Sequence, residues 1–441
     1  MDAQLLRLVQ AGDVKSADAL LRAVPTDVLA GDEGSSLLRA AMVAGYTDVV
    51  ESLLDAGVDP NRAWTDGADP VSWAADHGAS RILQELLSSN LVPWRKQLPE
   101  DAARKALQIA RPWLDVDPVL ELRRRLGVVQ EESVVVECER IPVTDWGLHT
   151  TRIRVTAADG RHAEVQTSHR AIVTYLEGRL GVPACPDELL ARARFYADPL
   201  SCDWAESQTV LANQRDPEET FRWAANLVAH PSVDTRRFVT DVLHRLSFDE
   251  RPFKTQALEV LRPRLRAEED PIALDNVIGA FASYTGRGDL TDLLPHARHP
   301  NPEIRRRVAG ELSAAIGELP QTAPRPDPPL IPFATPPDVV GTLIELASDV
   351  DDRTRANALL TLAESGIDTQ EVRDLMVARL TDEYQDARVE AAVGLALRDD
   401  PQGVDALRQM GARARYDTHV GQRLYWADRI LAHRVAERRM T

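Results

Sequence analysis

The apolar positions in the first part of the chain recur with a fixed period of 33 residues. The period is marked by three glycines and by the leucine pairs that follow them: Gly12, Gly45, Gly78, Leu20 and Leu21, Leu53 and Leu54, Leu86 and Leu87. A repeat of this length is one supersecondary unit that buries its apolar face against its neighbour. The pattern therefore predicts a stack of helix pairs over residues 1–90.

The second and third units carry further recurring segments. The middle unit, from Gly34 to Asn61, contains GSSLLRAA, GYTDVV and LLDAGVDPN, and the third unit begins with GADP at Gly67. These segments resemble ankyrin repeats. The first unit lacks the turn glycine and proline and resembles a capping repeat. The resemblance implies helix pairs that present a binding face, and it names no partner.

A second helical pattern begins near residue 200. Turns that contain Asp, Asn or Pro are followed a few residues later by an arginine, at Arg236, Arg305, Arg355 and Arg388. The turn residue caps the coming helix, and the arginine can reach back to the turn. The pattern resembles HEAT repeats of the short phycobilin-lyase type, over about 200–435. The block at Asp270 lacks the arginine, so its register stays open.

Residues 133–167 interrupt the helical pattern. Segments 151–156 and 162–167 alternate apolar with polar residues around a turn that contains Asp159 and Gly160, and 133–139 has the composition of a strand. This is a hairpin signal. We expect a small three-stranded antiparallel sheet, followed by a helix near 169–180. The insert either presents a binding surface or fills the gap between two unlike repeat stacks.

A run of prolines occupies residues 319–338. The spacing of Pro326 and Pro329 could dock in an aromatic groove. A simpler interpretation is an insertion between two helix pairs.

These patterns define the expected architecture. The fold class is mostly α, with an ankyrin-like stack at 1–90 and a HEAT-like α-solenoid at 200–441. A connector at 91–199 carries the β insert.

Length and composition narrow the class of protein. The chain has 441 residues and three cysteines without paired spacing, Cys138, Cys185 and Cys202. It begins with an amphipathic helix, not a signal peptide, and has no apolar run of membrane-spanning length. We expect a cytoplasmic protein without disulfides or a membrane partner.

The formal net charge is −17, and the two repeat stacks carry most of it. A nucleic-acid-binding surface needs a basic stripe that neutralises phosphates. The acidic charge therefore disfavours nucleic acid as a partner. The arginine runs at 123–125 and 305–307 weaken this argument, so nucleic acid is not excluded. Acidic repeats favour a basic protein partner.

No signature of a known catalytic class occurs in the sequence, and no spacing of ligands indicates a metal or other cofactor. The segment 145–149 is the first candidate site, because Asp145 and His149 could act as general acid or base beside Trp146. A structural loop is the alternative interpretation.

Aromatic residues gather between 195 and 284, accompanied by His230. Trp204 and Trp223 fall where the two stacks and the insert should meet, and such junctions often hold pockets. They are candidate ligand-binding residues, with His230 as a third candidate acid or base. Core packing explains the same aromatic spacing.

Two function classes remain. The first is a repeat scaffold that binds a protein partner through its concave faces. The second is a small-molecule enzyme or binder of lyase, isomerase or cyclase type, with a site where the insert meets the HEAT-like solenoid. Whether the protein is an enzyme stays open, as does its oligomeric state, since a free edge of the sheet could pair with a second copy.

Overall fold

The computed structural model describes residues 3–22, 24–129, 132–144, 147–248, 253–286, 290–315, 337–411, 420–427 and 429. The chain divides into two compact units, residues 1–223 and 224–441. Most of the proline-rich segment expected at 319–338 lies outside the described residues, as do Asp145 and Trp146. The structure is mostly helical with one small antiparallel sheet, which confirms the predicted fold class.

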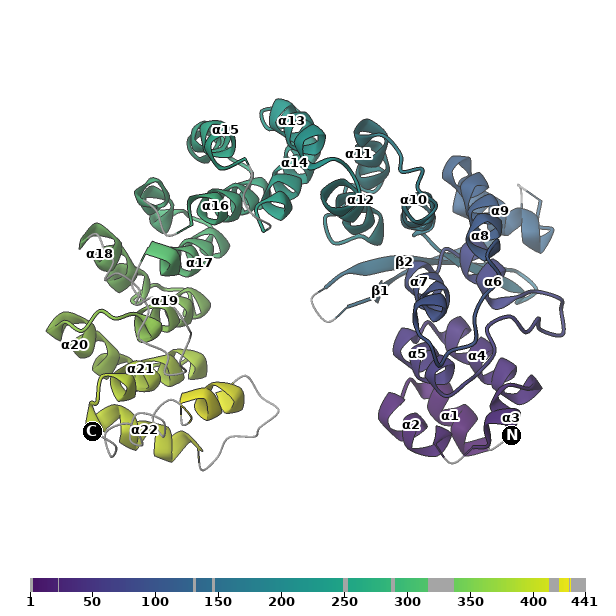
Figure 1. Cartoon of the computed structure of the whole chain (residues 1–441), viewed down its shortest axis with the longest axis horizontal. Coiled ribbons are helices and arrows are strands. Elements are labelled where there is room, and N and C mark those ends of the chain that lie inside the picture. The colour runs from purple at the N-terminus through teal and green to yellow at the C-terminus, as the bar shows by residue number, and fades with distance from the viewer. Residues whose placement is uncertain are drawn as a thin grey trace. The chain divides into compact units, whose positions relative to one another are not determined.

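The first unit contains helix pairs, then the sheet, then further helices (Figure 1). Its elements before the sheet are α1 (Ala3–Ala11), α2 (Val14–Leu21), α3 (Thr26–Leu29), α4 (Asp32–Ala44), α5 (Thr47–Asp55), α6 (Pro70–Asp76), α7 (Ser80–Ser88), η1 (Ser89–Leu91), α8 (Ala102–Ala110), η2 (Arg111–Asp115) and α9 (Pro118–Leu126). After the sheet follow α10 (His169–Arg179), α11 (Pro186–Arg194), α12 (Cys202–Asn213) and α13 (Pro217–Leu227), whose last residues belong to the second unit.

One apolar core joins the elements of this unit. It runs from Leu5 in α1 to Leu176 in α10 and includes the leucine pairs that marked the period in the sequence. The predicted boundary at residue 90 falls inside the unit, because α8 and α10 bury their apolar sides in the same core.

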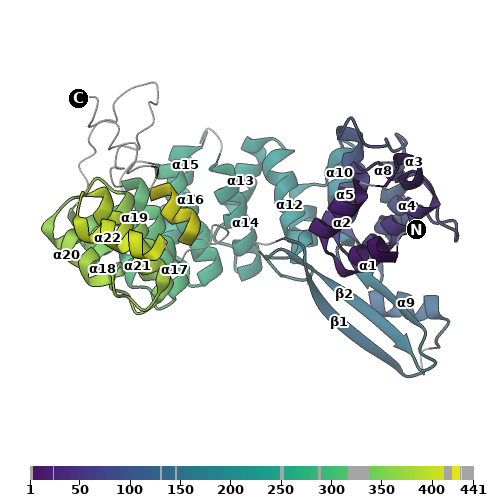
Figure 2. The same ribbon diagram turned by 90° about the horizontal axis from the view of Figure 1, so that it is seen from below.

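The sheet has the order β1-β2-β3 and contains β1 (Val134–Pro142), β2 (His149–Ala157) and β3 (His162–Gln166). The β2–β3 turn contains Gly160 at a φ of 85°, as the Asp-Gly signal predicted. One face of β2 and β3 packs through Val155 and Val165 on Leu122 of α9. The β1–β2 hairpin extends away from the helix pairs (Figure 2).

Asp76, at the end of α6, fastens the sheet and its neighbouring helices to the helix pairs. Its carboxylate accepts two hydrogen bonds from Arg125 of α9, at 2.6 and 2.7 Å, and one from the indole of Trp113, at 3.1 Å. Its carbonyl lies 3.1 Å from Nε2 of His169, whose ring stacks on Trp113. Burial lowers the pKa of His169 to about 4, so the stacked ring is neutral at neutral pH.

The turn between α6 and α7 touches β3 directly. The Gln166 amide donates to the His77 carbonyl at 2.8 Å. Gly78 has a φ of 64°, and a Cβ there would lie 2.0 Å from the Gln166 carbonyl oxygen. This periodic glycine is therefore required both by its backbone conformation and by the close approach of the strand.

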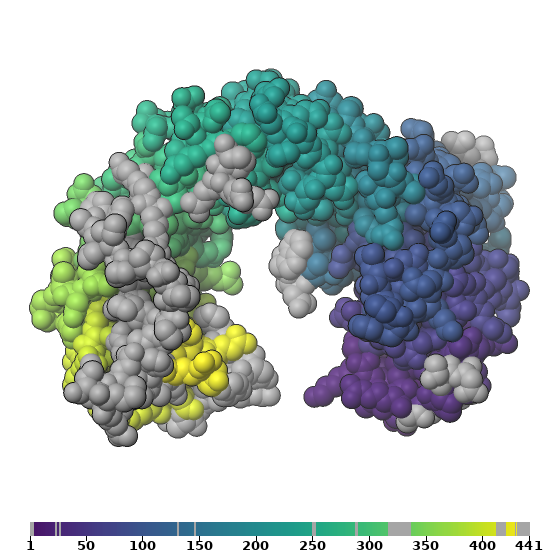
Figure 3. All heavy atoms as spheres, viewed as in Figure 1, coloured from purple at the N-terminus to yellow at the C-terminus, as the bar shows by residue number. Residues whose placement is uncertain are grey.

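The second unit is built from helices in two layers (Figure 1). Its elements are α14 (Val233–Leu246), α15 (Lys254–Ala267), α16 (Pro271–Thr285), η3 (Thr291–Arg298), α17 (Pro302–Glu311), η4 (Leu312–Ala315), α18 (Pro337–Leu346), α19 (Asp352–Glu364), α20 (Gln370–Arg379), α21 (Gln385–Leu397) and α22 (Pro401–Gly411). Helices α14, α16, α17, α19 and α21 pack successively on one another. Figure 3 shows the chain with all heavy atoms as spheres, in the same view as Figure 1.

A repeated arginine fork links the turns of this unit. Arg305 donates from Nη1 to two carbonyls of its own turn, those of His299 and Pro300, at 2.9 and 3.1 Å. Its Nε and Nη2 reach both oxygens of Asp349 in the next turn, each at 2.7 Å. Arg236 donates to both carboxylate oxygens of Glu268, and Arg355 donates to both of Asp382, in the same way. The predicted contact between each arginine and its preceding turn is confirmed.

The carboxylate in each fork also stabilises its own turn. Asp349 Oδ1 accepts the amide hydrogen of Asp351, which in turn caps α19 at Thr354. Burial alone would raise the pKa of Asp349, but its contacts with Arg305 outweigh burial and hold that pKa below its usual range. Each fork therefore fixes two turns and one helix start together.

The register left open at Asp270 is settled by the structure. Asp270 caps α16 at Ala273, and Leu274 stands where the other helices carry arginine. In the following turn His299 replaces the carboxylate and accepts the amide hydrogen of Asn301 through Nδ1, at 3.1 Å. Both partners of the fork are thus missing together.

None of the helices in the described part of the chain has the length and apolar character needed to cross a bilayer.

Replacing Gly78 with alanine should destabilise the first unit by roughly 2–5 kcal/mol, since a left-handed backbone and a steric clash both oppose the new methyl group. Gly67→Ala is the matched control, because Gly67 also has a positive φ but no atom within 4 Å of the added Cβ. It should cost about 1 kcal/mol. Thermal unfolding followed by circular dichroism measures both, and equal costs would contradict the proposed clash.

Arg305→Lys should lower the free energy of unfolding by about 1–3 kcal/mol, because lysine cannot reproduce the fork. Arg306→Lys changes a neighbouring arginine that pairs with Glu303 in its own helix and should cost under about 0.5 kcal/mol. Hydrogen exchange of α17 and α19 amides localises the effect. Comparable loss in both variants would show that the fork is not the cause.

Candidate functional site

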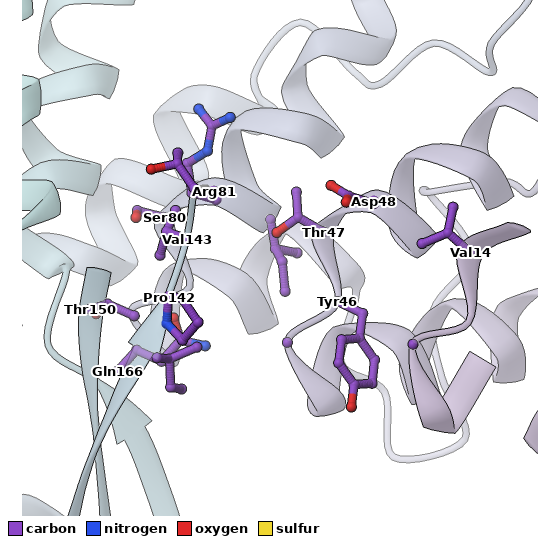
Figure 4. Close-up of a pocket in the computed structure, with 15 residues that line it drawn as sticks. Val14, Tyr46, Thr47, Asp48, Ser80, Arg81, Pro142, Val143, Thr150 and Gln166 are labelled. Atoms are coloured by element: carbon purple, nitrogen blue, oxygen red, sulfur yellow. The ribbon is translucent and has the colours of Figure 1, made fainter. Parts of the chain in front are cut away.

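A groove with a volume of about 240 Å³ lies in the first unit, between three helix starts and the ends of the strands. Figure 4 shows Val14, Tyr46, Thr47 and Asp48 on the helix side, and Pro142, Thr150 and Gln166 on the strand side. The contacts of Asp76 and Gly78 hold the helix side and the strand side together. The groove therefore depends on the same contacts that attach the sheet to the helix pairs.

The helix side of the groove repeats with the 33-residue period. Val14, Thr47 and Ser80 are the first residues of α2, α5 and α7, and each follows a turn glycine by two positions. Tyr46 lies over Gly12, where a Cβ would be 2.7 Å from its ring. Equivalent positions of three successive helix pairs therefore contribute to one surface.

The groove offers mixed chemistry. Asp48 and Arg81 contribute opposite charges, Tyr46 contributes an aromatic ring, and Pro142 and Val143 contribute apolar surface. The lining therefore combines charged and hydrogen-bonding groups with aromatic and apolar surface. Among the described residues there is no group of His, Cys, Asp and Glu side chains that could hold a metal ion.

A buried polar layer lies behind the groove. Ser168 Oγ donates to Thr150 Oγ1 at 2.6 Å. Burial raises the pKa of Cys202 to about 11, against the opposing effect of hydrogen bonds with Ser80 and Ser168, so its thiol stays protonated at neutral pH. A protonated thiol is a poor nucleophile, and this cysteine has the character of a core residue.

Asp203 is the most deeply buried acid of this layer. Its Oδ1 accepts the Ala171 amide hydrogen at 2.7 Å, and no partner reaches its Oδ2 in the described structure. Burial raises the pKa of Asp203 to about 7, against the opposing effects of the Ala171 hydrogen bond and of Arg170 and Arg192.

His149 is the predicted acid or base that the structure describes in the first unit. It is buried, with Nε2 2.9 Å from the Asp198 carboxylate and Nδ1 3.2 Å from the Gly147 carbonyl. Its backbone amide donates to Leu200. These contacts fasten the start of β2 to the segment before α12. The other two members of the predicted segment, Asp145 and Trp146, lie outside the described residues.

The two predicted aromatic residues have different surroundings. Trp204 is 1% exposed in α12 and does not line the groove. Trp223 is half-buried in α13, and its Nε1 donates to Asp187 of α11 at 2.9 Å. Both contribute to packing between helices of the first unit.

His230 belongs to the second unit, where it occupies the turn position that Asp349 has in a later repeat. Its Nδ1 accepts the Ser232 amide hydrogen at 3.0 Å, and its carbonyl accepts a hydrogen bond from Arg236. The ring thus has the same turn-stabilising contact as His299.

Both arginine runs noted in the sequence contact neighbouring carboxylates. The ion pairs are Arg124 and Arg125 with Glu121, Arg125 with Asp76, Arg305 with Asp349, Arg306 with Glu303, and Arg307 with Asp275. These contacts offset the positive charge of the two runs.

Sequence reasoning located the period but not the groove. The 33-residue period shows that the positions following the three glycines are equivalent in successive units. The polar segment from Tyr46 to Asp48 follows the glycine of the middle unit. The missing information was the position of the strand ends, because the contact of Gln166 with His77 joins segments far apart in the chain.

The fold makes this chain a helical repeat protein. Its sequence and structure are compared below with those of known proteins. No family model matches it. Over 90 residues it is 36% identical to the inactive serine/threonine-protein kinase TEX14 of Mus musculus, a stretch that covers 20% of this chain and 6% of TEX14.

Two solved structures illustrate the likeness. YibA of Escherichia coli aligns with a TM-score of 0.43 at 16% identity, covering 58% of this chain and 96% of YibA. An engineered protein aligns with a TM-score of 0.35 at 14% identity, covering 97% of this chain and 98% of its own.

Asp203→Asn should stabilise the protein at pH 8 by roughly 1–3 kcal/mol and by clearly less at pH 5. Folded Asp203 keeps its proton up to about pH 7, whereas the unfolded group, at its ordinary pKa of 3.8, does not. Its contribution to stability is therefore fully present only below pH 3.8, falls as pH rises from 3.8 to about 7, and is absent above that.

Asparagine keeps the acceptor for Ala171 and cannot ionise, which makes this substitution nearly isosteric. Chemical unfolding of both proteins at the two pH values measures the difference. A stability difference that is independent of pH would contradict the raised pKa.

Proposed function

We propose that this chain is a repeat scaffold that binds a protein partner, and that the groove of the first unit is a contact surface. One observation carries the proposal: Val14, Thr47 and Ser80 line a single groove from equivalent positions of successive helix pairs. Repeat proteins commonly bind through such surfaces, because stacking sets equivalent side chains side by side.

The finer assignment follows the repeat patterns. The first helix pairs are ankyrin-like, and the helices of the second unit are HEAT-like. The second unit offers a further groove of about 490 Å³ along α16, α17 and α19, lined by Asp275, Glu303 and Glu311 among others. Concave faces of both kinds support a scaffold role.

The partner is inferred to be basic. The net charge is −17, and Asp48 is an exposed carboxylate on the groove of the first unit. Complementary charge speeds encounter and orients the partner.

The enzyme interpretation stays a prediction without a supporting observation. His149 and His230 have hydrogen-bonding contacts that stabilise backbone segments, and Trp204 is buried.

Asp48→Arg should weaken binding of a stoichiometric partner about tenfold, since it reverses a charge on the groove. Glu100→Arg makes the same charge change at an exposed residue that does not line the groove. Affinity purification from native lysate identifies the partner, and calorimetry with the purified partner compares the three proteins.

Retention of no protein, or equal binding by both variants, would contradict the proposal. A small molecule that raises the melting temperature of the wild type, but not of Asp48→Arg, would instead support the ligand-binding alternative.

A further inference from the structure

The outer edge of β1 has no neighbouring strand in the described part of the first unit. β1 is the first strand in the order β1-β2-β3, and residues 135–140 are exposed. Val135 is 61% exposed and Val136 is 43% exposed. Figure 2 shows β1 along the free side of the hairpin, with β2 on its other side.

The register shows which backbone groups point outward. Val143 donates to the Leu148 carbonyl at 2.7 Å, and the β1–β2 pairing continues without a bulge to Val134 opposite Ala157. Because antiparallel pairs alternate, the odd-numbered residues of β1 bond to β2. The even-numbered residues Val134, Val136, Cys138 and Arg140 therefore direct their amide hydrogens away from the sheet.

The other side of β2 confirms this alternation. The Thr167 amide donates to Thr151 at 2.9 Å, so odd-numbered residues of β2 bond to β3 and even-numbered ones face β1.

Proteins protect edge strands with charged side chains, especially lysine, and with proline, bulges or short length. Of these features β1 has the charged side chains Glu137, Glu139 and Arg140, which select the charge of an added strand. β1 has nine residues, no lysine and no bulge, and its proline comes at the end, at Pro142. A long regular edge with exposed valines is suited to accept another strand.

The charges on β1 identify the kind of strand. Glu137 and Glu139 are exposed on one face of the strand, between Val135 and Ile141. Arg154, opposite Glu137 in the register, forms an ion pair with Glu164 at 2.7 Å. Glu137 is thus available to a side chain on the free edge, whereas Glu139 lies 3.3 Å from Arg152 of β2 and would share its carboxylate with an added strand. Directly opposed charges stabilise strand pairs.

In the registers that pair most of β1, a second copy of this chain is a poor occupant. A two-fold antiparallel register centred on Cys138 pairs the whole strand but sets Glu137 against Glu139 of the other copy. Centring the register on Glu137 or on Glu139 places identical carboxylates directly opposite each other. Like charges in these positions destabilise the pairing.

We propose that the edge of β1 binds an extended segment of a protein partner by strand addition, and that this segment alternates lysine or arginine with apolar or β-branched residues. Basic side chains lie opposite Glu137 and Glu139, and apolar ones lie opposite Val135 and Ile141. This deepens the proposed scaffold function. The edge of β1 adjoins the groove at Ile141 and Pro142, but Val136 and Glu137 do not line the groove, so Asp48→Arg and the β1 variants test the two surfaces separately.

The test uses the full chain and the synthetic peptide Val-Thr-Lys-Val-Lys-Thr-Val, which presents both lysines on one face in either orientation. Residue-resolved hydrogen exchange should show slowed exchange at Val136, Cys138 and Arg140 when the peptide is added, and little change at Val134, which lies beyond the end of the seven-residue peptide. The amides of Glu137 and Glu139 bond to β2 and should be protected before addition.

Two variants separate backbone pairing from charge. Val136→Pro removes an outward amide hydrogen without breaking a bond to β2, and should abolish binding while leaving the circular dichroism melt unchanged. Glu137→Lys should weaken binding of the lysine peptide about two- to fivefold and strengthen binding of the same peptide with glutamate for lysine.

Peptide binding that Val136→Pro leaves unchanged, or protection that appears away from β1, would overturn the proposal. Edge amides already protected without peptide, together with a dimer in sedimentation, would assign the edge to a second copy instead. Partner binding that Asp48→Arg leaves unchanged, together with normal peptide binding to β1, would leave the β1 proposal standing without the groove.

Discussion

The second unit depends on one interaction, the arginine fork that joins successive turns. A guanidinium group has enough donors in fixed directions to bond two carbonyls of its own turn and both oxygens of the next carboxylate. Arg305 and Arg355 use all of these directions. Because the same carboxylate receives a turn amide, helix starts, turns and neighbouring repeats are held at fixed spacing by a single ion pair.

The repeats of the first unit are held together by a different kind of contact. Its helix pairs stack through apolar residues, and the sheet is attached at the α6–α7 turn by Asp76 and by the close contact of Gly78 with Gln166. This attachment positions the strand ends beside the helix starts. The groove lies at the strand ends that this attachment positions, and the free edge of β1 begins beside the groove, at Ile141 and Pro142.

Much of the fold was predictable from local patterns. The 33-residue period, the caps such as Asp351 and the hairpin at Gly160 are set by neighbours in sequence, and the structure contains all three. The candidate sites were less predictable, because aromatic spacing does not distinguish a pocket from a core, and Trp204 proved to be buried. Long-range contacts such as that between Gln166 and His77 leave no local signal.

The missing fork at Leu274 has a mechanical consequence. Between α16 and α17 the ion pair of Arg307 with Asp275 remains, and its side chains are about one-third exposed, whereas Asp382 in the Arg355 fork is almost fully buried. Salt screens an exposed pair more strongly than a buried one. Under tension along the chain, raising the ionic strength would therefore lower the force at which this joint yields.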